Sequence, residues 1–140
     1  MITLMAKAAE NFCIHQIRQP HTLSDKKIET RTLIAYIDIA KEDGANYRIY
    51  TAYNEAMIQM IAELFLGEDE SDEETLQDMA LETANMIIGS AKVLAAEESD
   101  LNFTISTPHF EKDGNFDLSS DAFKTITIDD KAIMIAIKEQ

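Results

Sequence analysis

The sequence predicts an α/β fold in which a mainly antiparallel sheet packs with long helices. Apolar residues recur at helical spacing in three segments, and they alternate with other residues in several shorter segments. The strand-like segments are arranged as hairpins between helices and do not follow a strict β-α-β order. This order favours a sandwich of helices on an antiparallel sheet.

The first expected element is a helix over residues 2–17. It ends near Pro20, because proline disfavours helix in the residue that precedes it. Cys13 lies in this apolar-patterned segment and is expected to be a small core residue. Residues 21–25 are expected to be a polar connector. The apolar stripe of the helix consists of Leu4, Met5, Ala8, Ala9, Phe12 and His15.

A hairpin is expected next, with strands over residues 31–40 and 45–53. Apolar residues alternate with other residues on both sides of Asp43-Gly44, and an Asp-Gly pair is typical of a tight hairpin turn. A second helix follows from Asn54, a suitable N-cap, and ends before Gly67, a suitable C-terminal stop.

An acidic segment, residues 68–74, predicts the start of a third helix. Negative charge is favourable at a helix N-terminus, and Ser71 with Glu74 three residues later fits a capping box. The alternatives are a metal site or a partner-binding patch, but the carboxylates are consecutive and are not spaced like those of a calcium loop. The helix itself is expected over residues 72–95.

The last third of the chain is expected to complete the sheet. The segment 109–120 is expected to be a loop or a short hairpin around Asp113-Gly114. Three strands are expected in this part of the chain, over residues 101–106, 123–128 and 132–137.

The length and the net charge of the chain limit its domain organisation and the classes of partner it can bind. A chain of 140 residues is expected to form one domain, residues 1–140, and its net charge of −14 argues against nucleic acid and against an anionic membrane surface. The charge suits a partner with a cationic site, or it only keeps the protein soluble. One cysteine, no membrane-spanning run and no signal-peptide pattern indicate a cytoplasmic protein. The three histidines lack partners at ligand spacing, so no metal site is expected.

The most informative segment of the expected third helix is residues 78–89. A helix advances about 100° per residue, so Asp78, Glu82, Asn85 and Gly89 fall within one narrow strip. The opposite face, which would meet the core, carries Leu76, Ala80, Thr83, Ile87, Ser90 and Leu94. Exposed asparagine and mid-helix glycine do not favour the helix, so the strip invites a functional explanation. The structural alternatives are that Gly89 marks a kink in the helix, or that it lets a neighbouring loop of the same chain pack closely.

The pattern Asp78-x-x-x-Glu82-x-x-Asn85-Met-Ile-x-Gly89 resembles the signature helix of the CheX chemotaxis phosphatases. It is also similar to the related CheC and flagellar switch phosphatases, and its single copy is typical of CheX. The resemblance runs from about residue 33 to 137 and is strongest over 61–108. Supporting segments are Leu64-Phe65-Leu66-Gly67 and Ile105-Ser106-Thr107-Pro108. The sequence departs from the family pattern in two places. The early strands hold fewer glycines than the family pattern leads us to expect, and residues 109–121 match no family pattern.

The resemblance implies a CheX/CheC-like sandwich fold. It also implies a phosphatase that removes the aspartyl phosphate of a CheY-type receiver domain. It implies that Asn85 orients the attacking water and that Glu82 pairs with the active-site lysine of the receiver. Asp78 and Gly89 are implied partner contacts. The protein would need no cofactor of its own, since Mg²⁺ is expected in the receiver, and a homodimer is implied. The alternatives are a receiver-binding or chemotaxis or flagellar adaptor module without catalysis, and a structural dimerisation domain.

Overall fold

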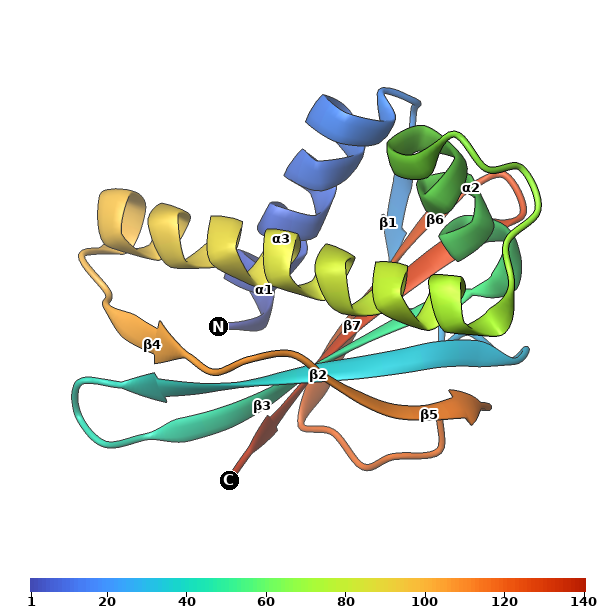
Figure 1. Ribbon diagram of the computed structural model, residues 1–140. Coiled ribbons are helices and arrows are strands. Elements are labelled where there is room, and N and C mark those ends of the chain that lie inside the picture. The colour runs from blue at the N-terminus through green and yellow to red at the C-terminus, as the bar shows by residue number, and fades with distance from the viewer.

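The computed structural model describes all residues from 1 to 140. It contains three α-helices and one seven-stranded sheet, and the helices lie on one face of the sheet (Figure 1). The elements are α1 (Ile2–Phe12), η1 (Cys13–Ile17), β1 (Thr22–Ser24), β2 (Thr32–Lys41), β3 (Asn46–Asn54), α2 (Glu55–Leu66), α3 (Glu73–Ser99), β4 (Phe103–Ile105), β5 (His109–Gly114), β6 (Ala122–Ile128) and β7 (Lys131–Glu139). Every strand pair is antiparallel, and the strand order is β1-β6-β7-β3-β2-β4, with β5 also pairing with β2. The predicted α/β class with a mainly antiparallel sheet is therefore confirmed.

The main core lies between the helices and the sheet. Alternate residues of β2, such as Leu33 and Ile37, face this core together with Ile49 of β3. A smaller apolar cluster covers the other face of the sheet and includes Ile34 of β2. In this cluster the ring of Phe116, from the β5–β6 connection, packs edge-to-face on Tyr50. Successive side chains of a strand point to opposite faces of the sheet, so each central strand contributes apolar residues to both clusters.

The first helix is confirmed, with an irregular end. Residues 13–17 form a π-helical turn in which Arg18 donates its backbone N–H to the Cys13 carbonyl at 2.7 Å. Because a π-turn takes up more residues than an α-turn, the buried stripe continues at Ile17, and the prediction that His15 belongs to it is wrong. The expected connector over residues 21–25 is also corrected, since it contains the short edge strand β1.

The hairpin and the second helix are confirmed. Strands β2 and β3 pair over nine residue pairs around the expected turn. The Asn54 side chain accepts a hydrogen bond from the Met57 backbone N–H at 3.0 Å, which is an N-cap. Gly67 ends α2 in the left-handed region at φ 74°, where glycine carries no steric penalty.

The third helix begins at a different cap from the expected one. Asp72, not Ser71, caps α3, and its carboxylate accepts the Thr75 backbone N–H at 2.8 Å. Hydrogen bonds from Thr75 hold the pKa of Asp72 below its usual range. Ser71 instead bonds the side chain of Gln59, which ties the acidic connection to α2. The predicted capping box is therefore wrong, and the helix runs to Ser99 instead of residue 95.

The segment after Pro108 was predicted incorrectly. Residues 109–114 form the edge strand β5 along β2, and Gly114 ends it without a hairpin of its own. Its burial pattern alternates strictly, but of its three half-buried positions only Phe110 is apolar, since Lys112 and Gly114 occupy the other two, so the alternation of apolar residues was too weak to predict a strand. The three strands predicted nearby are confirmed as β4, β6 and β7.

Arg31 ties the first residues of α2 and α3 to the end of β5. Its guanidinium pairs with Asp113 of β5, with Glu55 at 2.9 Å and with Glu73 at 2.8 Å. Arg31 holds the pKa of Asp113 below its usual range. The contact fixes the N-terminal end of α3 against the sheet, because Glu73 is the first residue of that helix.

We expect Arg31→Gln to lower the free energy of unfolding at pH 7 by about 1 kcal/mol or less, since solvent screens the 41% exposed side chain. Because the folded state lowers the pKa of Asp113, ionised Asp113 stabilises the fold at pH values above the pKa of an ordinary aspartate. This stabilisation is lost as the pH falls through the lowered pKa. The difference from wild type in urea unfolding should therefore shrink at pH 3. Arg18→Gln is the control, because Arg18 bonds only a backbone carbonyl. An equal difference for Arg31→Gln at both pH values would contradict the role of the carboxylates.

Candidate functional site

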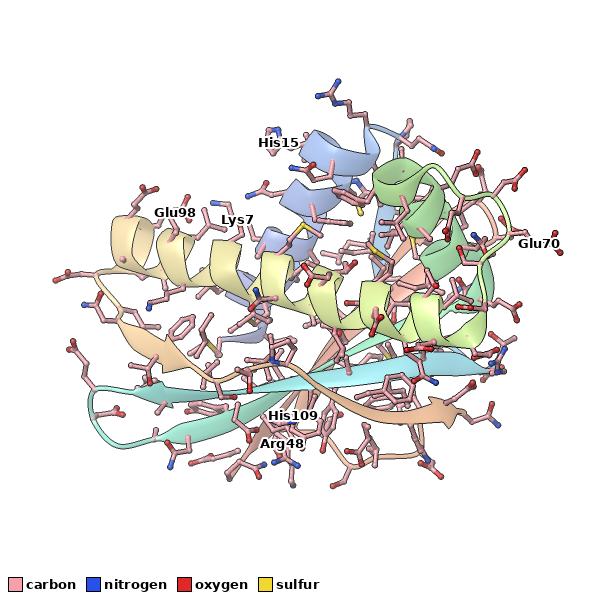
Figure 2. The ribbon with its side chains drawn as sticks, viewed as in Figure 1. Lys7, His15, Arg48, Glu70, Glu98 and His109 are labelled. Carbon is pink, nitrogen blue, oxygen red and sulfur yellow. The ribbon has the colours of Figure 1, made fainter.

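Helix α3 lies across the helical side of the sheet and packs on β2, α1 and α2 (Figure 1). Its buried face is formed by Leu76, Met79, Ala80, Thr83, Ala84, Ile87, Ile88, Ala91 and Ala95. Of the six residues predicted for this face, four are buried, and Ser90 and Leu94 are half-buried. At its far end, Glu98 accepts a hydrogen bond from Lys7 of α1 at 2.6 Å, and the two side chains lie side by side in Figure 2. The helix is thus held along its whole length.

The predicted strip lies on the free face of this helix. The side chains of Asp78, Glu82 and Asn85 are all exposed. None of the three makes a hydrogen bond or an ion pair within the chain; the polar contacts of α3 are at its two ends. Because the helix is fixed by its buried face, these side chains are presented to solvent on a rigid support and are free to meet a partner.

Gly89 completes the strip with an open position. A Cβ built at Gly89 would meet no atom within 4 Å outside its own helix and its chain neighbours. The alternative of a loop of the same chain packed closely on this glycine is therefore wrong. The missing side chain leaves the helix backbone accessible at the centre of the exposed face.

The strip combines two kinds of polar chemistry. The Asn85 amide has two donor hydrogens and an acceptor oxygen, so it can fix the orientation of one water molecule. The carboxylates of Asp78 and Glu82 suit a cationic partner group, and a charge-assisted contact of this kind is stronger than a neutral hydrogen bond. Together they form a surface that can recognise a cation and position a water molecule next to it.

The remaining polar groups do not converge into a second site of this kind. His21 contacts Glu10 at 2.8 Å, His109 stacks on Tyr36 on the other face of the sheet (Figure 2), and His15 is exposed. No group of three or more His, Cys, Asp or Glu side chains is arranged to hold a metal ion. No helix is long and apolar enough to cross a bilayer.

Cys13 is buried, and burial raises the pKa of its thiol to about 11. The nearby Glu10 charge acts in the same direction. The thiol is therefore protonated near neutral pH and packs as a small apolar residue. The predicted core role of Cys13 is confirmed.

The cavities lie away from the strip. The largest, about 660 Å³, lies beside the connection into β6, and none of the three cavities is lined by a strip residue. The candidate site is therefore a convex helix surface and not a pocket.

The exposed face of α3 is longer than the strip predicted from the sequence. It continues past Gly89 through the exposed residues Lys92, Val93 and Ala96. Helical spacing from Glu82 and Asn85 would have found these residues. The ion-pair centre at Arg31 was also missed, but its partners are 24 to 82 residues away in sequence, so no local pattern could reveal it.

Comparison with known proteins identifies the relatives of this fold. Residues 34–129 match the model of the family described as chemotaxis phosphatase CheX. This segment contains the whole strip from Asp78 to Gly89. No curated protein matches the sequence.

Solved structures share the fold at low sequence identity. The chemotaxis protein CheX from Vibrio vulnificus is 19% identical with a TM-score of 0.84, covering 99% of this chain and 95% of its own. A chemotactic CheC-like protein from Shewanella oneidensis MR-1 is 15% identical with a TM-score of 0.79, covering 99% and 97%. A chain of the CheX-CheY-BeF3-Mg+2 complex from Borrelia burgdorferi is 16% identical with a TM-score of 0.67, covering 98% and 97%.

The fold, the helix that carries the strip and the family match over most of the chain agree with one another. The predicted resemblance is confirmed: this chain belongs to the CheX family of chemotaxis phosphatases.

Proposed function

We propose that this protein hydrolyses the aspartyl phosphate of a CheY-type receiver domain. Membership in a family of chemotaxis phosphatases supports this activity. One solved structure with the same fold is a chain from a complex that contains CheY, BeF3 and Mg+2. The observation that carries the proposal is that Glu82 and Asn85 stand exposed on one face of α3 with no partner in their own chain.

In the proposed reaction, Asn85 enters the phosphorylated site of the receiver and orients a water molecule for in-line attack. The water oxygen forms a bond to phosphorus, and the bond between phosphorus and the aspartyl oxygen breaks. The products are inorganic phosphate and the free aspartate carboxylate of the receiver. Phosphoryl transfer depends mainly on positioning and charge stabilisation, so one oriented amide suffices without a covalent intermediate.

Glu82 is proposed to pair with the active-site lysine of the receiver and to set the docking register. Such a contact is charge-assisted and becomes partly desolvated on docking. Asp78 and Gly89 are proposed to contact the receiver beside these two residues. Mg²⁺ bound by the receiver would neutralise charge on the phosphoryl group, and this chain would need no cofactor of its own.

A phosphate-release assay with purified CheY-type receivers, phosphorylated by a small-molecule phosphodonor, tests the proposal. Faster release of phosphate from at least one receiver in the presence of the protein is the expected result. A receiver that binds without faster release would instead support the adaptor alternative. If no receiver is either bound or dephosphorylated, the proposal fails.

The proposed setting is the cytoplasm, and the proposed assembly is a homodimer paired through sheet edges. The single cysteine supports the first, since it forms no internal disulfide. The edge strands β1, β4 and β5 support the second, because they carry unpaired backbone groups. Sedimentation of the purified protein only as a monomer would contradict the dimer.

A further inference from the structure

The largest cavity, about 660 Å³, lies where two connections of the chain meet at the β1 edge of the sheet. One connection leaves β1 and the other enters β6. Because Ser24 pairs with Thr125, the chain after β1 runs beside the first residues of β6, and Figure 1 shows these two strands. Small-molecule sites typically have volumes of about 300–1,000 Å³. No residue that lines this cavity belongs to α3, so the cavity is separate from the strip.

The charges that line this cavity leave one cation without a partner. The Lys124 ammonium pairs with Asp25 at 2.5 Å, and the Asp121 carboxylate pairs with Lys138 at 3.6 Å. Lys27 also lines the cavity, and it forms no ion pair. Once the two pairs are counted as neutral, Lys27 is the one charge left over. The cavity therefore favours an anion, although the chain as a whole carries a net charge of −14.

The unpaired polar side chains of the cavity can all donate a hydrogen bond to such an anion. The hydroxyls of Ser119 and Ser120 line the cavity and form no hydrogen bond within the chain, so they are free to donate, as is the Lys27 ammonium. The Lys27 ammonium lies 5.6 Å from the centre of the Phe123 ring, and this cation–π contact holds it at the cavity wall. The apolar part of the wall consists of Ile2, Leu118, Ala122 and Phe123.

We propose that this cavity binds a small organic acid in its ionised form, a function additional to the phosphatase activity. The carboxylate of the ligand accepts hydrogen bonds from Lys27 and the two serines, and its apolar body lies against the apolar part of the wall. A hydrogen bond between an ammonium and a carboxylate is stronger than a neutral one, and burial of the apolar body adds to the affinity. A cationic ligand would meet Lys27 and find both carboxylates of the cavity already paired.

Benzoate, benzyl alcohol and benzylamine test the proposal, because the three compounds share a ring and differ in charge. Each is titrated into the isotope-labelled full chain at fixed ionic strength, and the backbone amide signals are followed by NMR. Benzoate is expected to shift the amides of residues 25–27 and 118–124 with a Kd on the order of 1 mM. Benzyl alcohol should bind about tenfold more weakly, because it lacks the charge that pairs with Lys27. Benzylamine, which is cationic at neutral pH, should not shift these amides at the same concentrations.

Two lysine variants show which cation the ligand uses. Lys27→Gln should weaken benzoate binding about tenfold, to the level of benzyl alcohol. Lys26→Gln is the matched control, because Lys26 is exposed and does not line the cavity, so the same change of charge should leave the Kd unchanged. Asn85→Ala should bind benzoate like the wild type, which keeps this test independent of the phosphatase proposal. Equal binding of benzoate and benzylamine, equal losses in both lysine variants, or no shift of the amides around the cavity would overturn the inference.

Discussion

Asn85→Ala is expected to lower kcat for a phosphorylated receiver about 100-fold, which corresponds to roughly 2.7 kcal/mol of transition-state stabilisation. In the proposed mechanism the amide only orients water, so its removal leaves receiver binding nearly unchanged. Asn85 is exposed and has no hydrogen bond within the chain, so nothing in the fold depends on it. Alanine is the better helix former, and the free energy of unfolding should stay equal or rise by a few tenths of a kcal/mol.

Single-turnover phosphate release and thermal unfolding of the same preparation check this prediction. Asn102→Ala is the control, because Asn102 is an exposed asparagine just after α3, outside the strip, and its removal should leave kcat unchanged. Asn85→Asp should also be inactive, since it places negative charge beside the phosphoryl group. Turnover near the wild-type value for Asn85→Ala would remove this residue from the mechanism.

Glu82→Ala is expected to raise the Kd for the receiver by one to two orders of magnitude. A hydrogen bond to a charged group contributes about 1.5–3 kcal/mol, and the loss would leave the receiver lysine without its partner. The effect should appear mainly in KM and kcat/KM, because Glu82 binds and orients the receiver and does not touch the attacking water.

Salt supplies an independent check on the ion pair. Raising the salt concentration should weaken binding of the wild type more than binding of Glu82→Ala, since screening acts on an attraction that the variant lacks. Glu42→Ala is the control: it removes the same charge from the exposed β2–β3 turn and should leave Kd unchanged. A similar loss of affinity in both variants would show that net charge, and not the pairing of Glu82, drives association.

Local patterns in the sequence predicted the parts of the fold that depend on local physics. Asn54 and Gly67 delimit α2 as expected, because caps depend on the residue itself and on its immediate backbone. The hairpin of β2 and β3 followed from alternation and an Asp-Gly turn. The strip on α3 followed from helical periodicity, which also separated its exposed residues from its buried ones.

The errors arose where distant contacts override local patterns. Ser71 bonds Gln59, and this tertiary contact removes it from the cap position that its sequence suggested. Strand β5 exists because β2 offers it an edge, and the polar pattern of β5 alone did not reveal the pairing. His15 is exposed because a π-helical turn changed the phase of the helix after Phe12. The roles of Glu82 and Asn85 were implied by family resemblance and stay a proposal.

The absence of a cavity at the strip has a consequence for inhibitor design. Drug-sized ligands bind in concave sites that enclose most of their surface, and none of the four strip residues, Asp78, Glu82, Asn85 and Gly89, lines any of the three cavities in the molecule. A small compound on this convex surface would bury little of its own area and would therefore bind weakly. Selective blockade therefore calls for a macromolecular binder, such as an antibody fragment with a concave paratope that encloses the ridge formed by Glu82 and Asn85.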